Sequence, residues 1–203
     1  MSESTAYAQR AVDFKFRCRP TVLIFAANWH ADVVDAMVAD ARKELESHGV
    51  SRVITIQVPG SFELPQAVSI YLSSTRYKKA YPTPDGIICF GCVVQGETPH
   101  FTFISQAAAN GLEALATRVG QIPMMFGILT TNSLQQALER ANGVHSRKGQ
   151  EVAHALLEML YFRDEVSGGQ CYAGRSFWLD LRLMWVGCCR WMKGLFSNCD
   201  RKP

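Results

Sequence analysis

The chain has 203 residues, 48% hydrophobic and 19% charged, a composition typical of an ordinary globular protein with a hydrophobic core. Its formal net charge of +3 comes from residues 166–203, which hold six Arg and Lys against two Asp, so the body is nearly neutral and gives no electrostatic case for nucleic-acid binding. The seven cysteines do not form a secreted disulfide framework, and residues 1–10 lack the apolar core of a signal peptide, which favours a cytoplasmic protein.

Apolar periodicity in the first half of the chain alternates between strand and helix. It predicts a buried strand over residues 21–27 and a helix over 32–48 that a glycine ends. A second strand is predicted at 53–58. The next helix, 62–75, has a proline in its first turn, where the missing N–H costs little.

The second half continues the alternation. Residues 86–94 form a continuous apolar run that is typical of a strand covered on both faces. A helix is predicted over 98–119, with Thr98 as its N-cap and Pro99 at its first position. A fourth strand follows at 123–129.

Two helices close this pattern, at residues 133–141 and 149–163, joined by the short loop 142–148. The element order predicts an α/β fold, a three-layer doubly wound (flavodoxin-like) sandwich around a mostly parallel four-stranded sheet. Ligands in such folds bind beyond the carboxyl ends of the strands, which here are followed by residues 27–30, 59–63, 96–100 and 130–131.

We expect three regions: an N-terminal arm (1–19), the main domain (20–165) and an atypical tail (166–203). Projection of residues 177–196 onto a helical wheel gives an apolar arc opposite a basic one, while the charges argue against a membrane span. Three readings of the tail stay open: an interfacial membrane helix (the less favoured one), a helix docked on its own subunit or assembly, or a non-native extension from a shifted reading frame.

Familiar nucleotide and metal signatures are missing from the sequence. No GxxxxGK[ST] motif occurs, and no GxGxxG follows the first strand. Cys89 and Cys92 form a CxxC, but residues three apart on a strand point to opposite faces, so we interpret both as buried structural side chains. No metal-ligand constellation or cofactor motif appears.

The segment 96–100 (GETPH) is the first candidate site. It follows a strand and opens a helix, so its backbone N–H groups can bind an anion. His100, in the first turn, has the chemistry of an acid or base near neutral pH. Taken alone, the same pattern is also typical of a plain surface histidine.

The strand ends taken together are more specific. Residues 58–65 (VPGSFELP), 91–100 (GCVVQGETPH), 126–141 (with FGILTT, QA and ERA) and 148–149 (KG) closely resemble the lumazine synthase family, and the resemblance spans about residues 20–162. It implies a transferase of riboflavin biosynthesis that condenses 5-amino-6-(D-ribitylamino)uracil with 3,4-dihydroxy-2-butanone 4-phosphate to 6,7-dimethyl-8-ribityllumazine, releasing phosphate and water. It implies no metal and no cofactor.

The resemblance also assigns residues. His100 is implied as the catalytic proton-transfer residue. The pyrimidine and ribityl chain are implied to bind at Trp29, Ser61, Phe62, Glu63, Cys92, Val93, Val94 and Phe126. The phosphate is implied to bind at Gly96, Glu97, Thr98, Arg140 and Lys148. Considered singly, Trp29 is equally typical of a core or interface residue, and Glu63 and Arg140 of solvated helix charges.

Departures from the family pattern are Trp29 in place of the commoner Phe, His30 in place of Asn, Gln95, and the whole tail. The family further implies a homopentamer or a sixty-subunit capsid, with sites shared between adjacent subunits, and the short loop 142–148 resembles that of capsid-forming members. Two other function classes stay open: a carrier that holds lumazine or flavin without turnover, and a structural shell, which is compatible with the enzyme.

Overall fold

A computed structural model of the chain describes residues 14, 16, 19–74, 83–143 and 146–167. Within these residues the sheet has the parallel strands β1 (Thr21–Ala27), β2 (Arg52–Val58), β3 (Gly86–Val94) and β4 (Met124–Thr131), in the order β2-β1-β3-β4. This is the flavodoxin-like order, so the predicted doubly wound α/β fold is confirmed.

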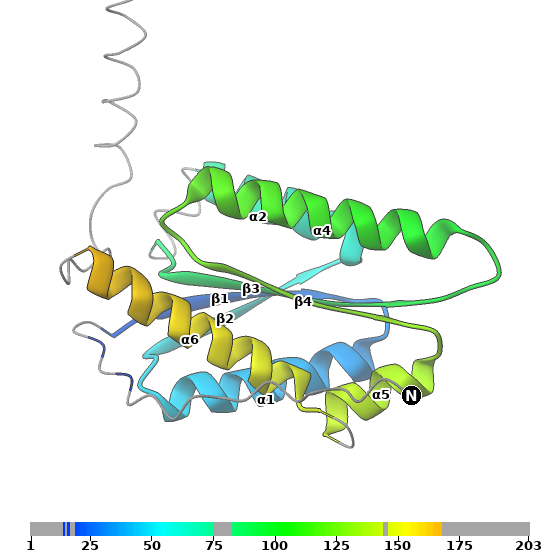
Figure 1. Cartoon of the computed structure of the whole chain (residues 1–203), viewed down its shortest axis with the longest axis horizontal. Helices are drawn as coiled ribbons and strands as arrows, with labels where there is room; N and C mark the ends of the chain where they lie inside the picture. The colour runs from blue at the N-terminus through cyan, green and yellow to red at the C-terminus, as the bar shows by residue number, and fades with distance from the viewer. Residues whose placement is uncertain (1–13, 15, 17–18, 75–82, 144–145, 168–203) are drawn as a thin grey trace, which may run out of the picture. The chain divides into compact units, whose positions relative to one another are not determined.

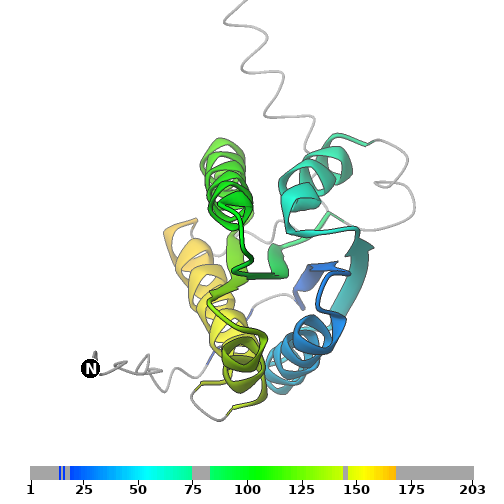
Figure 2. The ribbon, with the colours of Figure 1, turned by 90° about the vertical axis from the view of Figure 1, so that its right-hand side faces the viewer.

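Helices cover both faces of the sheet, which makes three layers (Figures 1 and 2). One face carries α1 (Ala31–Ser47), α5 (Leu134–Asn142) and α6 (Lys148–Val166). The other carries α2 (Leu64–Ser73) and α4 (His100–Val119). The strands are buried on both sides because each face packs against a helix layer.

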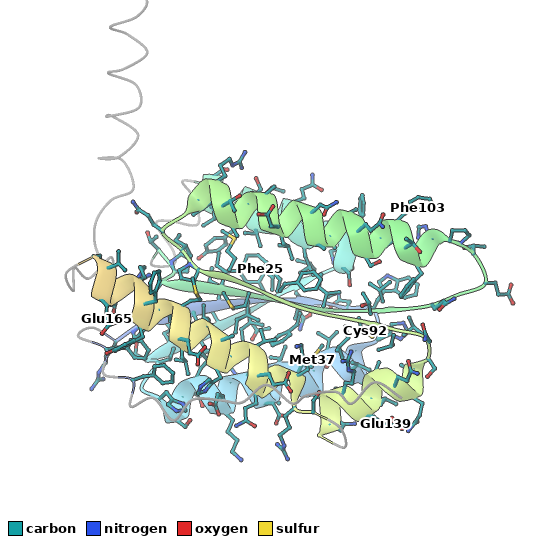
Figure 3. The ribbon with its side chains drawn as sticks, viewed as in Figure 1. Phe25, Met37, Cys92, Phe103, Glu139 and Glu165 are labelled. Atoms are coloured by element: carbon teal, nitrogen blue, oxygen red, sulfur yellow. The ribbon has the colours of Figure 1, made fainter. Side chains whose placement is uncertain are left out.

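Two hydrophobic cores result, one on each face of the sheet. Met37 of α1 lies in the core under α1 and α6, and Phe25 of β1 lies in the core under α2 and α4 (Figure 3). The predicted divergence of the CxxC side chains is confirmed, because Cys89 belongs to the second core and Cys92 to the first. Both thiols are free.

Two predicted helix starts are corrected by the structure. The predicted helix 62–75 opens with a short 3-10 turn, η1 (Ser61–Glu63), and α2 proper begins at Leu64, with the proline in its first turn as expected. Thr98 is not the N-cap of α4. Pro99 takes that place without a side-chain cap, because its carbonyl accepts the Thr102 N–H at 3.0 Å and its φ of −64° already suits a helix.

The packing of α6 on α1 fixes the start of α6. A Cβ on Gly149 would collide with the backbone carbonyl of Met37, so only glycine permits this approach. Farther along, the carboxylate of Glu44 accepts a hydrogen bond from Gln150 at 3.0 Å and lies 3.2 Å from Nδ1 of buried His154. These contacts hold the first two turns of α6 in register with α1.

The last helix extends beyond the predicted end at residue 163, to Val166. The predicted features of residues 168–203, including the amphipathic segment 177–196, lie outside the described residues. No helix in the described part of the chain is both long and apolar enough to cross a membrane.

Candidate functional site

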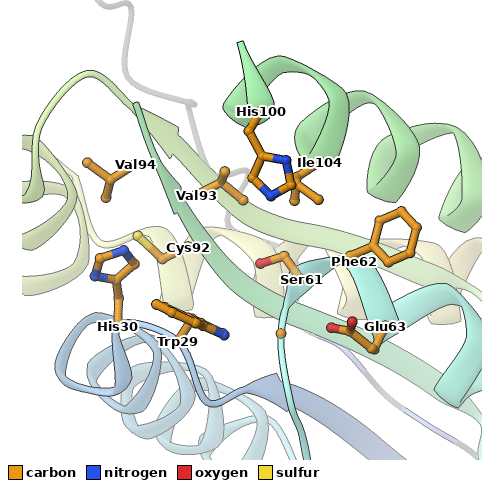
Figure 4. A pocket seen from close by; sticks show the side chains of 11 residues that line it. Trp29, His30, Ser61, Phe62, Glu63, Cys92, Val93, Val94, His100 and Ile104 are labelled. Carbon is orange, nitrogen blue, oxygen red and sulfur yellow. The ribbon is translucent and has the colours of Figure 1, made fainter. Parts of the chain in front are cut away.

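A pocket of about 370 Å³ opens at the carboxyl ends of β1, β2 and β3 (Figure 4). β1 is bonded to β2 on one side and to β3 on the other, so the order in which the parallel strands are added reverses there, and such switch points form crevices in doubly wound sheets. The pocket is lined by Trp29, His30, Gly60, Ser61, Phe62, Glu63, Cys92, Val93, Val94, His100 and Ile104.

Two exposed aromatic side chains border the pocket. Trp29, just after β1, is 69% exposed, and Phe62 of η1 is 55% exposed. The Trp29 ring lies close over Gly60, because a Cβ there would be 3.2 Å from Trp29 Cδ1 and 2.9 Å from Glu63 Oε2. An indole held at a pocket wall offers a flat surface for stacking a planar ligand.

The first residue of η1 brings a buried hydroxyl to the pocket. Ser61 is 5% exposed, and its Oγ has no hydrogen-bond partner among the described residues. It packs against Gly91 of β3, where a Cβ would collide with Ser61 Oγ and stand 3.2 Å from Ser61 Cβ. A buried hydroxyl without a partner is costly, so this atom is suited to pair with a polar ligand.

The end of β3 supplies an apolar wall. Cys92, Val93 and Val94 line the pocket at the last residues of the strand. Burial raises the pKa of the Cys92 thiol to about 11. The thiol therefore stays protonated at neutral pH, and Cys92 acts as a small packing group and not as a nucleophile.

His100 reaches the pocket from the first turn of α4, and Ile104, one turn later, lies beside it (Figure 4). Gly96, Glu97 and Thr98 precede this helix in an exposed loop and are not among the lining residues. The first N–H groups of the helix have no intrahelical acceptor, which suits an anion close to the loop.

Three further predicted residues lie elsewhere on the chain. Phe126 of β4 and Lys148 of α6 line a second pocket of about 200 Å³ that shares no lining residue with the first. Lys148 Nζ lies 3.3 Å from Glu151 Oε2. Arg140 is exposed on α5 and lines neither pocket.

His30, Gly60 and Ile104 also line the pocket. His30 and Gly60 lie in the strand-end segments 27–30 and 59–63 where the sequence predicts ligand binding, but neither they nor Ile104 were assigned individually as site residues. Ile104 follows His100 by four residues, and on a helix that spacing places both on one face, which is a signal the sequence contains. Gly60 lies in the motif at 58–65, but its role depends on the Trp29 ring above it. His30 adjoins Trp29 at a strand end.

In the described part of the chain, no group of three or more His, Cys, Asp or Glu is arranged to hold a metal ion. Fold and pocket together define a flavodoxin-like α/β protein whose pocket at the strand ends combines exposed aromatic side chains, a carboxylate and a histidine.

Comparison with known proteins identifies the family. A family model described as 6,7-dimethyl-8-ribityllumazine synthase matches residues 19–164. Proteins of that name from Kineococcus radiotolerans and Porphyromonas gingivalis are each 40% identical, over 139 and 138 residues, covering 68% and 67% of this chain and 81% of each relative. The one from Levilactobacillus brevis is 39% identical over 146 residues, 71% of this chain and 88% of its own. The chain belongs to the lumazine synthase family.

Proposed function

We propose that the protein catalyses the family reaction, the condensation of 5-amino-6-(D-ribitylamino)uracil with 3,4-dihydroxy-2-butanone 4-phosphate to 6,7-dimethyl-8-ribityllumazine. The observation that carries this proposal is the pocket itself. Side chains from four separate segments, including Trp29, Glu63, Cys92 and His100, meet in one cavity of about 370 Å³. A cavity of that size suits a small organic substrate.

The pyrimidine stacks on Trp29, and its ribityl chain extends toward η1. Ser61, whose hydroxyl has no partner among the described residues, and Glu63 both line the pocket and provide hydrogen-bonding groups for a polyol. Phe62 and the apolar end of β3 (Cys92, Val93 and Val94) enclose the ring system. Stacking combined with a few polar contacts fixes the orientation of the reacting amine.

The phosphate of the second substrate binds next to the start of α4. The loop residues Gly96, Glu97 and Thr98 bring backbone N–H groups to the helix N-terminus, which favours an anion. Arg140 and Lys148 complete the phosphate site from a neighbouring subunit. Arg140 is suited to this because its planar guanidinium donates two parallel hydrogen bonds to phosphate.

In this mechanism the uracil amine adds to the ketone carbonyl, water leaves to form the imine, and loss of a carbon-bound proton accompanies departure of the phosphate. The second amine then closes the ring with loss of another water. His100 shuttles protons in these steps. Holding the two substrates together contributes much of the rate, because correct orientation replaces a bimolecular encounter.

We further propose a homo-oligomer built from pentamers, in which each site is completed by a second copy. Phe126 and Lys148 line a pocket separate from that of Trp29 and His100, which a site shared between copies explains. Large apolar side chains that are exposed on the single chain, Phe103 at 67% and Phe162 at 59%, provide surface for such contacts. A capsid-like shell of such pentamers is compatible with catalysis. The cysteine usage supports a cytoplasmic location.

The catalytic domain corresponds to residues 20–165, and the tail contributes nothing to the reaction. The family model ends at residue 164, and the described part of α6 ends at Val166. A truncation after Ser167 should therefore keep the Michaelis constants of both substrates within about twofold of those of the full chain, because it removes none of the pocket residues. A large loss of activity in a truncated protein that still assembles would show that the tail shapes the site.

The decisive experiment mixes the full-length protein with both substrates and follows the fluorescence of the lumazine product. Turnover well above the uncatalysed rate supports the enzyme. A coloured or fluorescent protein that binds lumazine without turnover would instead show a carrier and overturn the proposal. Sedimentation velocity of the same sample separates a pentamer from a sixty-subunit shell, and an active monomer at micromolar concentration would refute the shared site.

A further inference from the structure

His30 has an unusual backbone for its residue type. Its φ of 55° and ψ of 52° lie in the left-handed helical region, and among the described residues it is the only non-glycine residue with positive φ. L-residues with a Cβ avoid this region, and exceptions that persist are concentrated at functional sites. The conformation therefore raises the question of what the side chain does.

The surrounding fold holds this backbone in place. The His30 carbonyl accepts hydrogen bonds from the N–H groups of Val33 at 3.0 Å and Val34 at 3.1 Å, which start α1. On the other side, the Asn28 N–H donates to the Val58 carbonyl at 2.9 Å and so extends the pairing of β1 with β2. The chain has three residues, 28–30, in which to turn from β1 to α1, and among them His30 has the left-handed backbone.

The His30 ring lies in the pocket wall beside Cys92 (Figure 4). It makes no side-chain cap hydrogen bond to α1, and no side-chain hydrogen bond of this residue is recorded among the described residues. The same view shows Trp29 between His30 and Glu63, so the imidazole stands at the end of the pocket away from η1. Next to it, the protonated Cys92 thiol and Val94 are poor hydrogen-bonding partners.

We propose that His30 is a substrate-binding residue that donates a hydrogen bond to the phosphorylated four-carbon substrate. The inference rests on the proposed function, in which the ribityl chain occupies the Glu63 end and the pyrimidine covers Trp29. The remaining end, beside Val94 and before the loop to α4, then receives the second substrate. That substrate has a carbonyl, hydroxyls and a phosphate, all of which accept a hydrogen bond from an imidazole N–H.

Two substitutions separate this role from a purely structural one. His30→Gly removes the ring and suits the left-handed backbone, but it also increases the freedom of the unfolded chain. Relief of the backbone strain stabilises the folded protein, and the freedom of glycine stabilises the unfolded chain. Because these two effects oppose each other, the melting temperature should stay within a few degrees of wild type. His30→Asn also tolerates this backbone and retains a side-chain N–H donor. Both variants are to be assayed as the full-length assembled protein, beside wild type, with each substrate varied in turn.

We expect His30→Gly to raise the Michaelis constant of the phosphorylated substrate by about three- to tenfold, the loss of one hydrogen bond. The Michaelis constant of the pyrimidine should not change, and His30→Asn should recover part of the loss. The assignment would be overturned if the Michaelis constants of both substrates were the same in His30→Gly as in wild type. It would also be overturned if the Michaelis constant rose for the pyrimidine alone or for both substrates, because that result would indicate displacement of Trp29. A wild type that forms no lumazine would instead overturn the proposed function on which the inference rests.

Discussion

The buried hydroxyl of Ser61 leads to a prediction in which protein stability and substrate binding change in opposite directions. Its Oγ is shielded from solvent and has no hydrogen-bond partner in the described part of the chain, yet Ser61 is one of the residues that line the pocket. In the free protein the hydroxyl therefore lowers the stability of the fold. Once the ribityl substrate binds, it becomes half of a hydrogen bond.

Ser61→Ala removes the hydroxyl and keeps the Cβ that packs against Gly91. Relief of an unsatisfied buried polar group is worth about 1–2 kcal/mol. For a domain of this size, about 1 kcal/mol corresponds to roughly 2–4 °C, so the melting temperature of the free protein should rise by a few degrees. The lost hydrogen bond should raise the Michaelis constant of the pyrimidine about two- to tenfold.

Thermal unfolding without ligand and steady-state kinetics with each substrate varied in turn measure the two effects. Ser105→Ala is the matched control, because the Ser105 hydroxyl donates to the Phe101 carbonyl at 2.8 Å on α4, and Ser105 is not a pocket residue. That variant should leave both Michaelis constants unchanged. A Ser61→Ala protein that melts several degrees lower and binds the pyrimidine normally would refute the reasoning, since its hydroxyl would then be paired within the protein.

Three further predictions test the packing and the site. Gly149→Ala should lower the free energy of unfolding, measured by chemical denaturation, by about 2–3 kcal/mol, since its Cβ would meet the backbone of α1 at 2.8 Å and closer. Gly96→Ala is the control and should be nearly neutral, because a Cβ there has nothing within 4 Å. Equal denaturation midpoints for the two variants would contradict this. Burial raises the pKa of the Cys92 thiol from 9.0 to about 11, so at pH 7.5 Cys92 has far less thiolate than an ordinary cysteine. Peptide mapping should therefore show Cys92 alkylated roughly 100-fold more slowly, and labelling at an ordinary rate would disprove that burial. Arg140→Ala should raise the Michaelis constant of the phosphorylated substrate about tenfold or more, whereas His100→Ala should lower turnover by about 100-fold or less. If Arg140→Ala instead weakened binding of the pyrimidine and left that of the phosphorylated substrate unchanged, the proposed orientation of the pocket would be reversed.

The sequence alone determined the parts of the protein that depend on local pattern. Strand and helix periodicity predicted the parallel sheet and its two helix layers, and alternation along β3 placed Cys89 and Cys92 on opposite faces. These predictions held because side-chain direction within one element follows directly from backbone geometry. The ordered motifs at the strand ends indicated the family, because each motif is continuous in the chain and can be read without the fold.

Only the tertiary structure decided how separate elements meet. It showed that Pro99 and not Thr98 is the N-cap of α4, and that the Ser61 hydroxyl has no hydrogen-bond partner among the described residues. It also separated Phe126 and Lys148 from the pocket of His100. Each of these results depends on atoms from segments far apart in the sequence or on a local competition between caps. Periodicity contains no information about such distances, because packing between helices and sheet sets them after the elements have formed.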